Sequence, residues 1–187
     1  MTPHQEISRI IGDFEQAKTS ARSVFDGLGS IQLTQRPSPN QWSIAECLAH
    51  LNLTARVQVD ALKSAIEKGL ARNLLAGGEK PRYSWISRKI IAMTEPPPSR
   101  KQKAPKRLVP IEFTLQGLLP EFLKLQDELI ACAHRSAPLD LVRAKVAFPF
   151  FRLLRFNLGA YFHIVAAHQR RHLWQAEQAK RGLVKAA

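Results

Sequence analysis

Hydrophobic residues recur every three or four positions along four long segments of the chain. These segments cover residues 5–27, 44–68, 113–134 and 153–181. That spacing places the apolar side chains on one face of an α-helix. The short stretch "LVRAKVAF" shows some alternation, and no alternating run of strand length stands out elsewhere. The pattern therefore predicts an all-α protein with four long helices around one core.

The second of these helices has the clearest start. Ser43 is a good N-cap, and Glu46 three positions later completes a capping box. Trp42 and Cys47 occupy the two positions of a hydrophobic staple. Residues 44–55 include one acidic residue and no basic one, so we expect this half of the helix to be buried on more than one side.

A long connection, residues 69–110, separates the second and third long helices. It contains "SWISRKIIAM", which predicts a short extra helix, and a basic proline-rich loop at about 95–110. Helices that are antiparallel neighbours in a bundle are joined by about two to eight residues. The longer connection indicates that the third helix starts at the far end and runs parallel to the second. Pro120 predicts either a kink in the third helix or a later start.

Length and composition indicate one ordinary globular domain. The 187 residues, of which 45% are hydrophobic and 23% charged, suffice for a single domain over residues 1–187. No run of about 18 apolar residues occurs, so no membrane span is expected. The polar start lacks a signal core, which predicts a cytoplasmic location. Cys47 and Cys132 lie in apolar segments and are expected to be reduced core residues.

The formal net charge of +13 favours polyanionic partners or acidic substrates. Part of it lies in the loop at about 95–110 and in a basic tail at about 180–187, where cations are commonly just solvated. Nucleic-acid binding is the weaker hypothesis, because helical nucleic-acid readers normally place their cations along a helix.

The last long helix carries three histidines within "FHIVAAHQRRHLWQ". At about 100° per residue, His168 and His172 continue the apolar stripe of this helix. His163 lies about 140° away from His168, so we expect it at the surface, with Arg170 and Arg171 also outside the stripe. Imidazoles four positions apart can converge on one metal ion. Two neutral buried histidines with no metal are the alternative.

A metal site would need a further ligand, and His50 in the second helix is the candidate. Its direction lies more than about 100° from the centre of that helix's apolar stripe. His50 therefore faces outward, or the helix is covered on two sides, and we favour the second alternative. His4 and His134 lie near segment ends and are expected at the surface.

The segments "NQWSIAECLAHL" and "HQRRHLWQA" resemble the two signature regions of the DinB-like (DinB/YfiT) four-helix proteins. Compared position by position, the family's first histidine matches His50 and its later pair matches His168 and His172. Arg171 and Gln175 fit the family's "H-x-x-R-H-x-x-Q" form. The resemblance covers residues 5–180 and implies a four-helix bundle in the order up-down-down-up.

The resemblance also implies a function. His50, His168 and His172 would bind a divalent metal ion, zinc or nickel by expectation, with iron and manganese as alternatives. The implied enzyme joins a low-molecular-weight thiol to a small electrophile, as a thiol-dependent S-transferase or isomerase, with a hydrolase as a further option. The competing hypothesis is a non-catalytic metal-binding or stress-response module that contacts nucleic acid through its basic loop.

Several neighbouring residues have two interpretations each. Glu46 can accept a hydrogen bond from the ring N–H of His50 or serve the capping box, and we favour the cap. Gln175 can bind substrate or end the apolar stripe. Tyr161 can reach the site or pack in the core, and the core is favoured. The phenylalanines at 148, 150 and 151 can form a homodimer surface or belong to the core.

Overall fold

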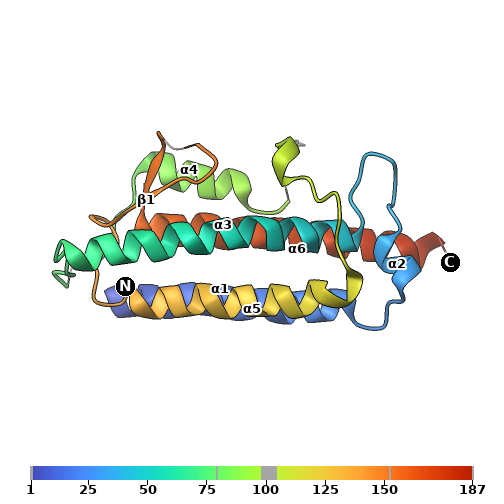
Figure 1. The fold of residues 1–187 in the computed structure, drawn as a ribbon, viewed down its shortest axis with the longest axis horizontal. Helices are drawn as coiled ribbons and strands as arrows, with labels where there is room; N and C mark the ends of the chain where they lie inside the picture. The colour runs from blue at the N-terminus through green and yellow to red at the C-terminus, as the bar shows by residue number, and fades with distance from the viewer. Residues whose placement is uncertain (1, 79, 98–104, 152, 187) are drawn as a thin grey trace.

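The computed structural model describes residues 2–78, 80–97, 105–151 and 153–186, apart from the side chains of residues 106 and 184–186. Four long helices dominate it (Figure 1). The elements in chain order are α1 (Pro3–Phe25), α2 (Ser30–Thr34), α3 (Ile44–Ala71), α4 (Trp85–Thr94), the 3₁₀ turn η1 (Lys106–Leu108), α5 (Leu115–Arg135), β1 (Lys145–Ala147), β2 (Arg155–Asn157) and α6 (Leu158–Ala186). The prediction of an all-α protein is confirmed.

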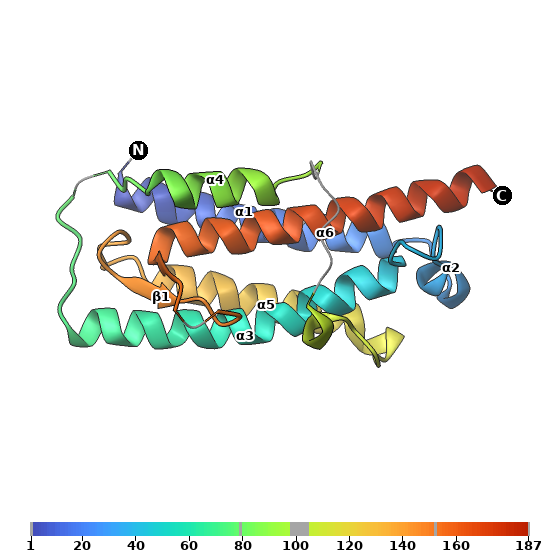
Figure 2. The same cartoon turned by 90° about the horizontal axis from the view of Figure 1, so that it is seen from above.

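Cross-helix contacts define the directions of the long helices. Between α3 and α5, the bonded pairs Lys63–Glu128 and Arg56–Glu121 are both 65 residues apart, so the two helices run parallel. Between α1 and α6, the pairs Glu6–His163 and Ser23–Lys180 are both 157 residues apart, so these helices are also parallel. Figures 1 and 2 show that α3 and α5 run opposite to α1 and α6.

The four long helices enclose an apolar core, in which α1 and α3 each pack against both α5 and α6. Phe14 and Phe122 are completely buried in the two parts of this core. Cys47 and Cys132 are free and buried, as predicted. α4 lies outside the four-helix layer and packs along α6 (Figure 2). α6 is therefore covered by three helices, which matters for the side chains discussed below.

The short helix predicted in the long connection is α4, capped by the Ser84 hydroxyl, which accepts from the Ser87 N–H. The capping box of α3 forms as predicted: the Glu46 N–H donates to Ser43 Oγ at 3.2 Å, and the Ser43 N–H donates to Glu46 Oε2 at 2.9 Å. The central part of the basic loop, residues 98–104, lies outside the described residues.

One expectation about the second half of the chain needs correction. The predicted helix 153–181 begins five residues late, at Leu158, because residues 155–157 form β2 and pair with β1 in an antiparallel hairpin. Within the predicted basic tail at about 180–187, α6 continues to Ala186, and Lys180 Nζ donates to the carbonyls of Ser23 and Asp26 at the end of α1. For the phenylalanines both alternatives stay open, because Phe148 packs on the core whereas Phe151 is 60% exposed.

Candidate metal centre

His50 lies in the second turn of α3, close to the capped start of the helix. Its side chain is only 3% exposed, so α3 is covered on two sides at this level. His50 Nδ1 lies 2.7 Å from the backbone carbonyl oxygen of Leu108 in η1. A carbonyl only accepts, so Nδ1 carries the proton and the neutral ring presents the lone pair of Nε2 to the bundle interior.

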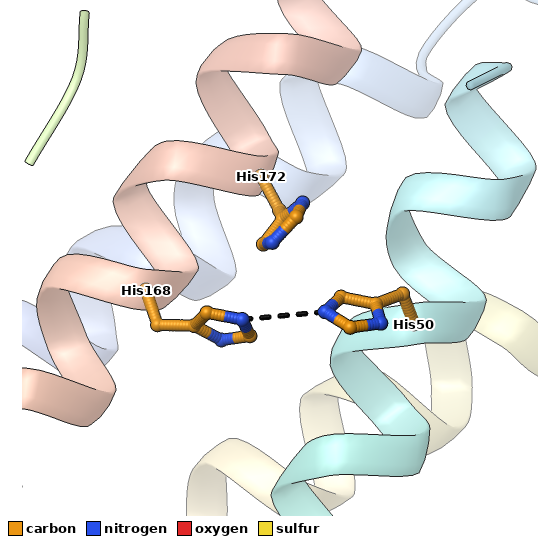
Figure 3. A group of neighbouring side chains, drawn as sticks. All are labelled: His50, His168 and His172. Atoms are coloured by element: carbon orange, nitrogen blue, oxygen red, sulfur yellow. Dashed lines mark hydrogen bonds between the residues drawn. The ribbon is translucent and has the colours of Figure 1, made fainter. Parts of the chain in front are cut away.

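His168 and His172 face His50 from successive turns of α6 (Figure 3). The Nε2 atoms of His50 and His168 lie 3.2 Å apart. The ring of His172 stands 4.5 Å from that of His50 and 4.6 Å from that of His168, between centroids. One nitrogen from each of the three rings lies within 4.8 Å of the other two. We call these residues the three-histidine cluster.

Burial keeps the three-histidine cluster neutral. Burial away from water lowers the pKa of His50. Burial is also the largest cause of the lowered pKa of His168, which is about 3. Burial away from water is the main reason why the pKa of His172 lies well below its ordinary value. The neighbouring His168 and His50 lower this pKa further. Metal ligation requires neutral imidazole, and all three rings satisfy this at neutral pH.

The donor set suits a divalent ion. The Nδ1 atoms of His168 and His172 are buried and have no hydrogen-bond partner within the described part of the chain. Burying polar nitrogens without partners is unfavourable by about 1–3 kcal/mol each. Three converging imidazoles and a fixed His50 tautomer are the features of a site that can hold a metal ion.

The comparison with protein families agrees with this geometry. The family model of the DinB superfamily matches residues 13–176, which is most of the chain and includes all three histidines. The chain belongs to the DinB superfamily. It also resembles the uncharacterized protein YuaE of Bacillus subtilis (strain 168), with 25% identity over 175 residues that cover 92% of this chain and 98% of YuaE. No solved structure matches the chain. Across the described residues, no helix is long and apolar enough to cross a membrane.

Two contacts of this DinB-superfamily site were not predicted from the sequence. The Trp42 indole stacks on His172, with ring centroids 5.6 Å apart and planes at 26°, and also contacts His50. It covers the cluster from the loop before α3. The second contact is the Leu108 carbonyl, which a sequence pattern cannot reveal because every residue carries one.

Two supporting predictions have clear outcomes, and the two interpretations of Gln175 both stay open. The Glu46 carboxylate accepts from the Ser43 N–H and pairs with Arg36, which agrees with the capping interpretation. Tyr161 is fully buried against Phe156 in the core, as favoured. Gln175 lies next to the cluster, where its side chain contacts His172 and opposes the lowering of that histidine's pKa.

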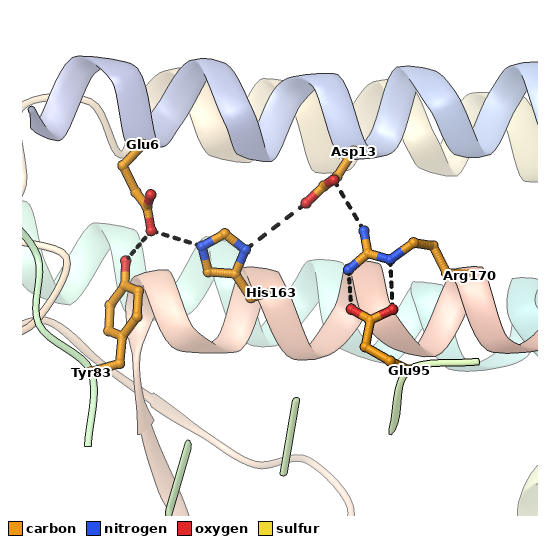
Figure 4. Close-up of polar contacts among 6 residues, drawn as sticks. All are labelled: Glu6, Asp13, Tyr83, Glu95, His163 and Arg170. Carbon is orange, nitrogen blue, oxygen red and sulfur yellow. Dashed lines mark hydrogen bonds and ion pairs between the residues drawn. The ribbon is translucent and has the colours of Figure 1, made fainter. Parts of the chain in front are cut away.

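The expectation that His163 lies at the surface is wrong. His163 is only 7% exposed, and its Nε2 lies 2.7 Å from the buried Glu6 carboxylate, which also accepts from the Tyr83 hydroxyl at 2.9 Å (Figure 4). The reason is that α1 and the segment leading into α4 cover this side of α6. His4 and His134, by contrast, are exposed as predicted.

The two arginines placed outside the stripe are also more enclosed than expected. Arg170 is half-buried and pairs with Asp13 at 3.0 Å and with Glu95 at 2.5 Å (Figure 4). Arg171 is 5% exposed, and its positive charge contributes to lowering the pKa of His168 and of His172 after the effect of burial. Arg171 is therefore within electrostatic reach of the three-histidine cluster.

Proposed function

We propose that this protein is a metal-dependent enzyme in which His50, His168 and His172 bind one divalent ion, with zinc or nickel expected before iron or manganese. The observation that carries the proposal is the convergence of three neutral, buried imidazoles from α3 and α6. A structural zinc site normally has four protein ligands, whereas three leave room for water or substrate. The donor set therefore favours a catalytic site over a structural one.

The proposed reaction is thiol S-transfer to a small electrophile. A divalent ion bound here would supply Lewis acidity and lower the pKa of a bound thiol or water. In a transfer to an alkyl or aryl halide, a carbon–sulfur bond forms and the carbon–halogen bond breaks. The halide leaves, and the thiol proton passes to solvent.

The residues around the cluster suit an anionic sulfur ligand. The positive charge of the Arg171 guanidinium acts on the cluster, because it contributes to lowering the pKa of His172. Arg171 is buried, and charges interact more strongly in a buried environment than in water. Trp42 stacks on His172 and provides apolar surface on that side of the cluster. The Leu108 carbonyl keeps the His50 Nε2 lone pair directed at the cluster.

The test compares His168→Ala with His134→Ala, which removes an exposed histidine of α5. Metal content and conjugation of small thiols with a chromogenic aryl halide are measured on each variant. We expect both to be lost in His168→Ala and retained in His134→Ala. Unchanged turnover in His168→Ala would refute the proposed mechanism. Bound metal without turnover over a broad set of thiols and electrophiles would favour a non-catalytic metal-binding module.

A further inference from the structure

Two adjoining pockets lie at the end of the bundle where α3 ends and α6 begins. The first has a volume of about 280 Å³ and is formed mainly by residues 76–77, 80–82 and 139–143. The second, of about 480 Å³, lies between residues 82–87 and residues 154–157, which include β2. Arg82 and Val142 line both. We call them the end pockets.

Cations dominate the lining of the end pockets. Lys80, Arg82 and Arg143 line the first pocket, and Arg82, Lys145 and Arg155 line the second. The one carboxylate among the described lining residues is that of Asp140. Its Oδ1 atom already accepts the backbone N–H groups of residues 142 and 143, at 2.9 and 3.0 Å.

These five cations have no counter-charge among the residues that the structure describes. Within the described part of the chain, none of their side chains takes part in an ion pair or a hydrogen bond, although cations elsewhere, such as Lys63 and Arg170, do. Like charges gathered around a pocket repel one another, and a bound anion removes that repulsion.

The walls that carry these cations are held in place by the fold. Asn157 Nδ2 donates to the Val142 carbonyl at 2.5 Å, and the Gly159 N–H donates to the Leu141 carbonyl at 3.0 Å. The antiparallel pairing of β1 and β2 places Lys145 opposite Asn157. Leu141 and Phe156 are buried and provide apolar surface beneath the charged groups.

We propose that the end pockets bind a small ligand with two anionic groups of the phosphate type, one in each pocket, with Arg82 between them. A guanidinium group binds two phosphate oxygens at once through paired, charge-assisted hydrogen bonds, whereas a lysine ammonium acts as a point charge. The arginines among the lining residues therefore suit a phosphate-type ligand. The concave shape favours phosphate groups of a small molecule over the backbone of a nucleic-acid duplex. Along α6, this site lies about 21 Å from His172, counting 1.5 Å per residue from Leu158 at the start of the helix. It does not rest on the metal site.

The experiment is calorimetric titration of the metal-free protein with pyrophosphate at low ionic strength. Wild type is compared with Arg82→Gln and with the control Arg88→Gln, which removes the same charge from an exposed position of α4 outside both pockets. We expect saturable binding that Arg82→Gln weakens about tenfold or more and that Arg88→Gln changes less than about twofold. Thermal melts of both variants check that they remain folded.

Orthophosphate should bind more weakly than pyrophosphate, because it fills one pocket only. His50→Ala should bind pyrophosphate as wild type does, so this proposal and the metal site fail or succeed separately. Vesicles with anionic phospholipid that compete with pyrophosphate would identify a lipid headgroup as the source of the phosphate, and absence of competition would identify a soluble ligand. Equal losses in Arg82→Gln and Arg88→Gln, or no saturable binding by wild type, would overturn the proposal.

Discussion

Gly159, near the start of α6, lies against Tyr83. A Cβ atom at position 159 would be 1.9 Å from the Tyr83 hydroxyl oxygen and 2.7 Å from the ring carbon Cζ. Contacts this short cannot exist, so Gly159→Ala must displace Tyr83. The displaced tyrosine would lose its 2.9 Å hydrogen bond to the buried Glu6 carboxylate. The substitution therefore tests whether this contact holds the α4 segment against the bundle.

The expected change in the free energy of unfolding follows from three contributions. A hydrogen bond to a charged group contributes about 1.5–3 kcal/mol. Forcing extra volume into a packed contact is unfavourable by about 1–3 kcal/mol, part of which is relieved when Tyr83 moves away. Alanine favours the helix over glycine by about 1 kcal/mol. We therefore expect Gly159→Ala to destabilise the protein by about 2 kcal/mol.

The assay is urea unfolding of wild type, Gly159→Ala, Tyr83→Ala and the double variant. In the Tyr83→Ala background nothing opposes the new methyl group, so Gly159→Ala should be neutral or stabilising by up to about 1 kcal/mol. Gly12→Ala is the matched control, because a Cβ at position 12 of α1 meets no atom within 4 Å. If Gly159→Ala stabilised wild type as Gly12→Ala does, the Tyr83 contact would be refuted.

Three further predictions concern the site and its surroundings. The Leu108 side chain is buried, so Leu108→Ala should loosen η1 and weaken zinc affinity about tenfold without changing the stoichiometry of binding. The control Ile111→Ala, at a position that is 87% exposed, should leave zinc affinity unchanged. Equal affinities by competition with a chelator would contradict this. Nickel binding should quench indole fluorescence in wild type and quench it much less in Trp42→Phe, because Trp42 stacks on the three-histidine cluster; identical quenching would show that the indole is remote. Burial raises the pKa of Glu6, but its bonds to histidine and tyrosine outweigh this and leave that pKa below the ordinary value of 4.5. The ionised carboxylate therefore stabilises the fold above pH 4.5 and loses this effect as the pH falls through its folded-state pKa. In urea titrations, Glu6→Gln should destabilise the protein by about 2 kcal/mol at pH 7 and by less at pH 3.5. A difference between the two proteins that does not change with pH would contradict this.

The long helices could be predicted from the sequence because the apolar spacing and the capping residues that define them are local features. Ser43 and Glu46 start α3 through contacts three residues apart, which any reader of the sequence can find. His168 and His172 were also accessible, since four-residue spacing on the apolar stripe of one helix brings them together. The β1–β2 hairpin was missed because three-residue strands are too short to show a period.

What could not be predicted depends on neighbouring elements. His163 lies off the apolar stripe of α6, and the sequence of α6 does not tell that α1 and the α4 segment cover that side. The same limit affected His50, whose direction disagreed with the apolar stripe of its own helix although its side chain is only 3% exposed. The role of Leu108 depends on a backbone carbonyl, which has no sequence signature.

The most direct test of the central claim is metal analysis of protein purified without an affinity tag, for wild type and His50→Ala. His50 is the most informative position for this test, because it is the proposed ligand from α3 that faces the two histidines of α6. Its ring orientation is fixed by the hydrogen bond to the Leu108 carbonyl. The account predicts about one divalent ion per wild-type chain and loss of that ion in His50→Ala. No bound metal after reconstitution of wild type, or equal metal in both proteins, would contradict a metal centre at the three-histidine cluster.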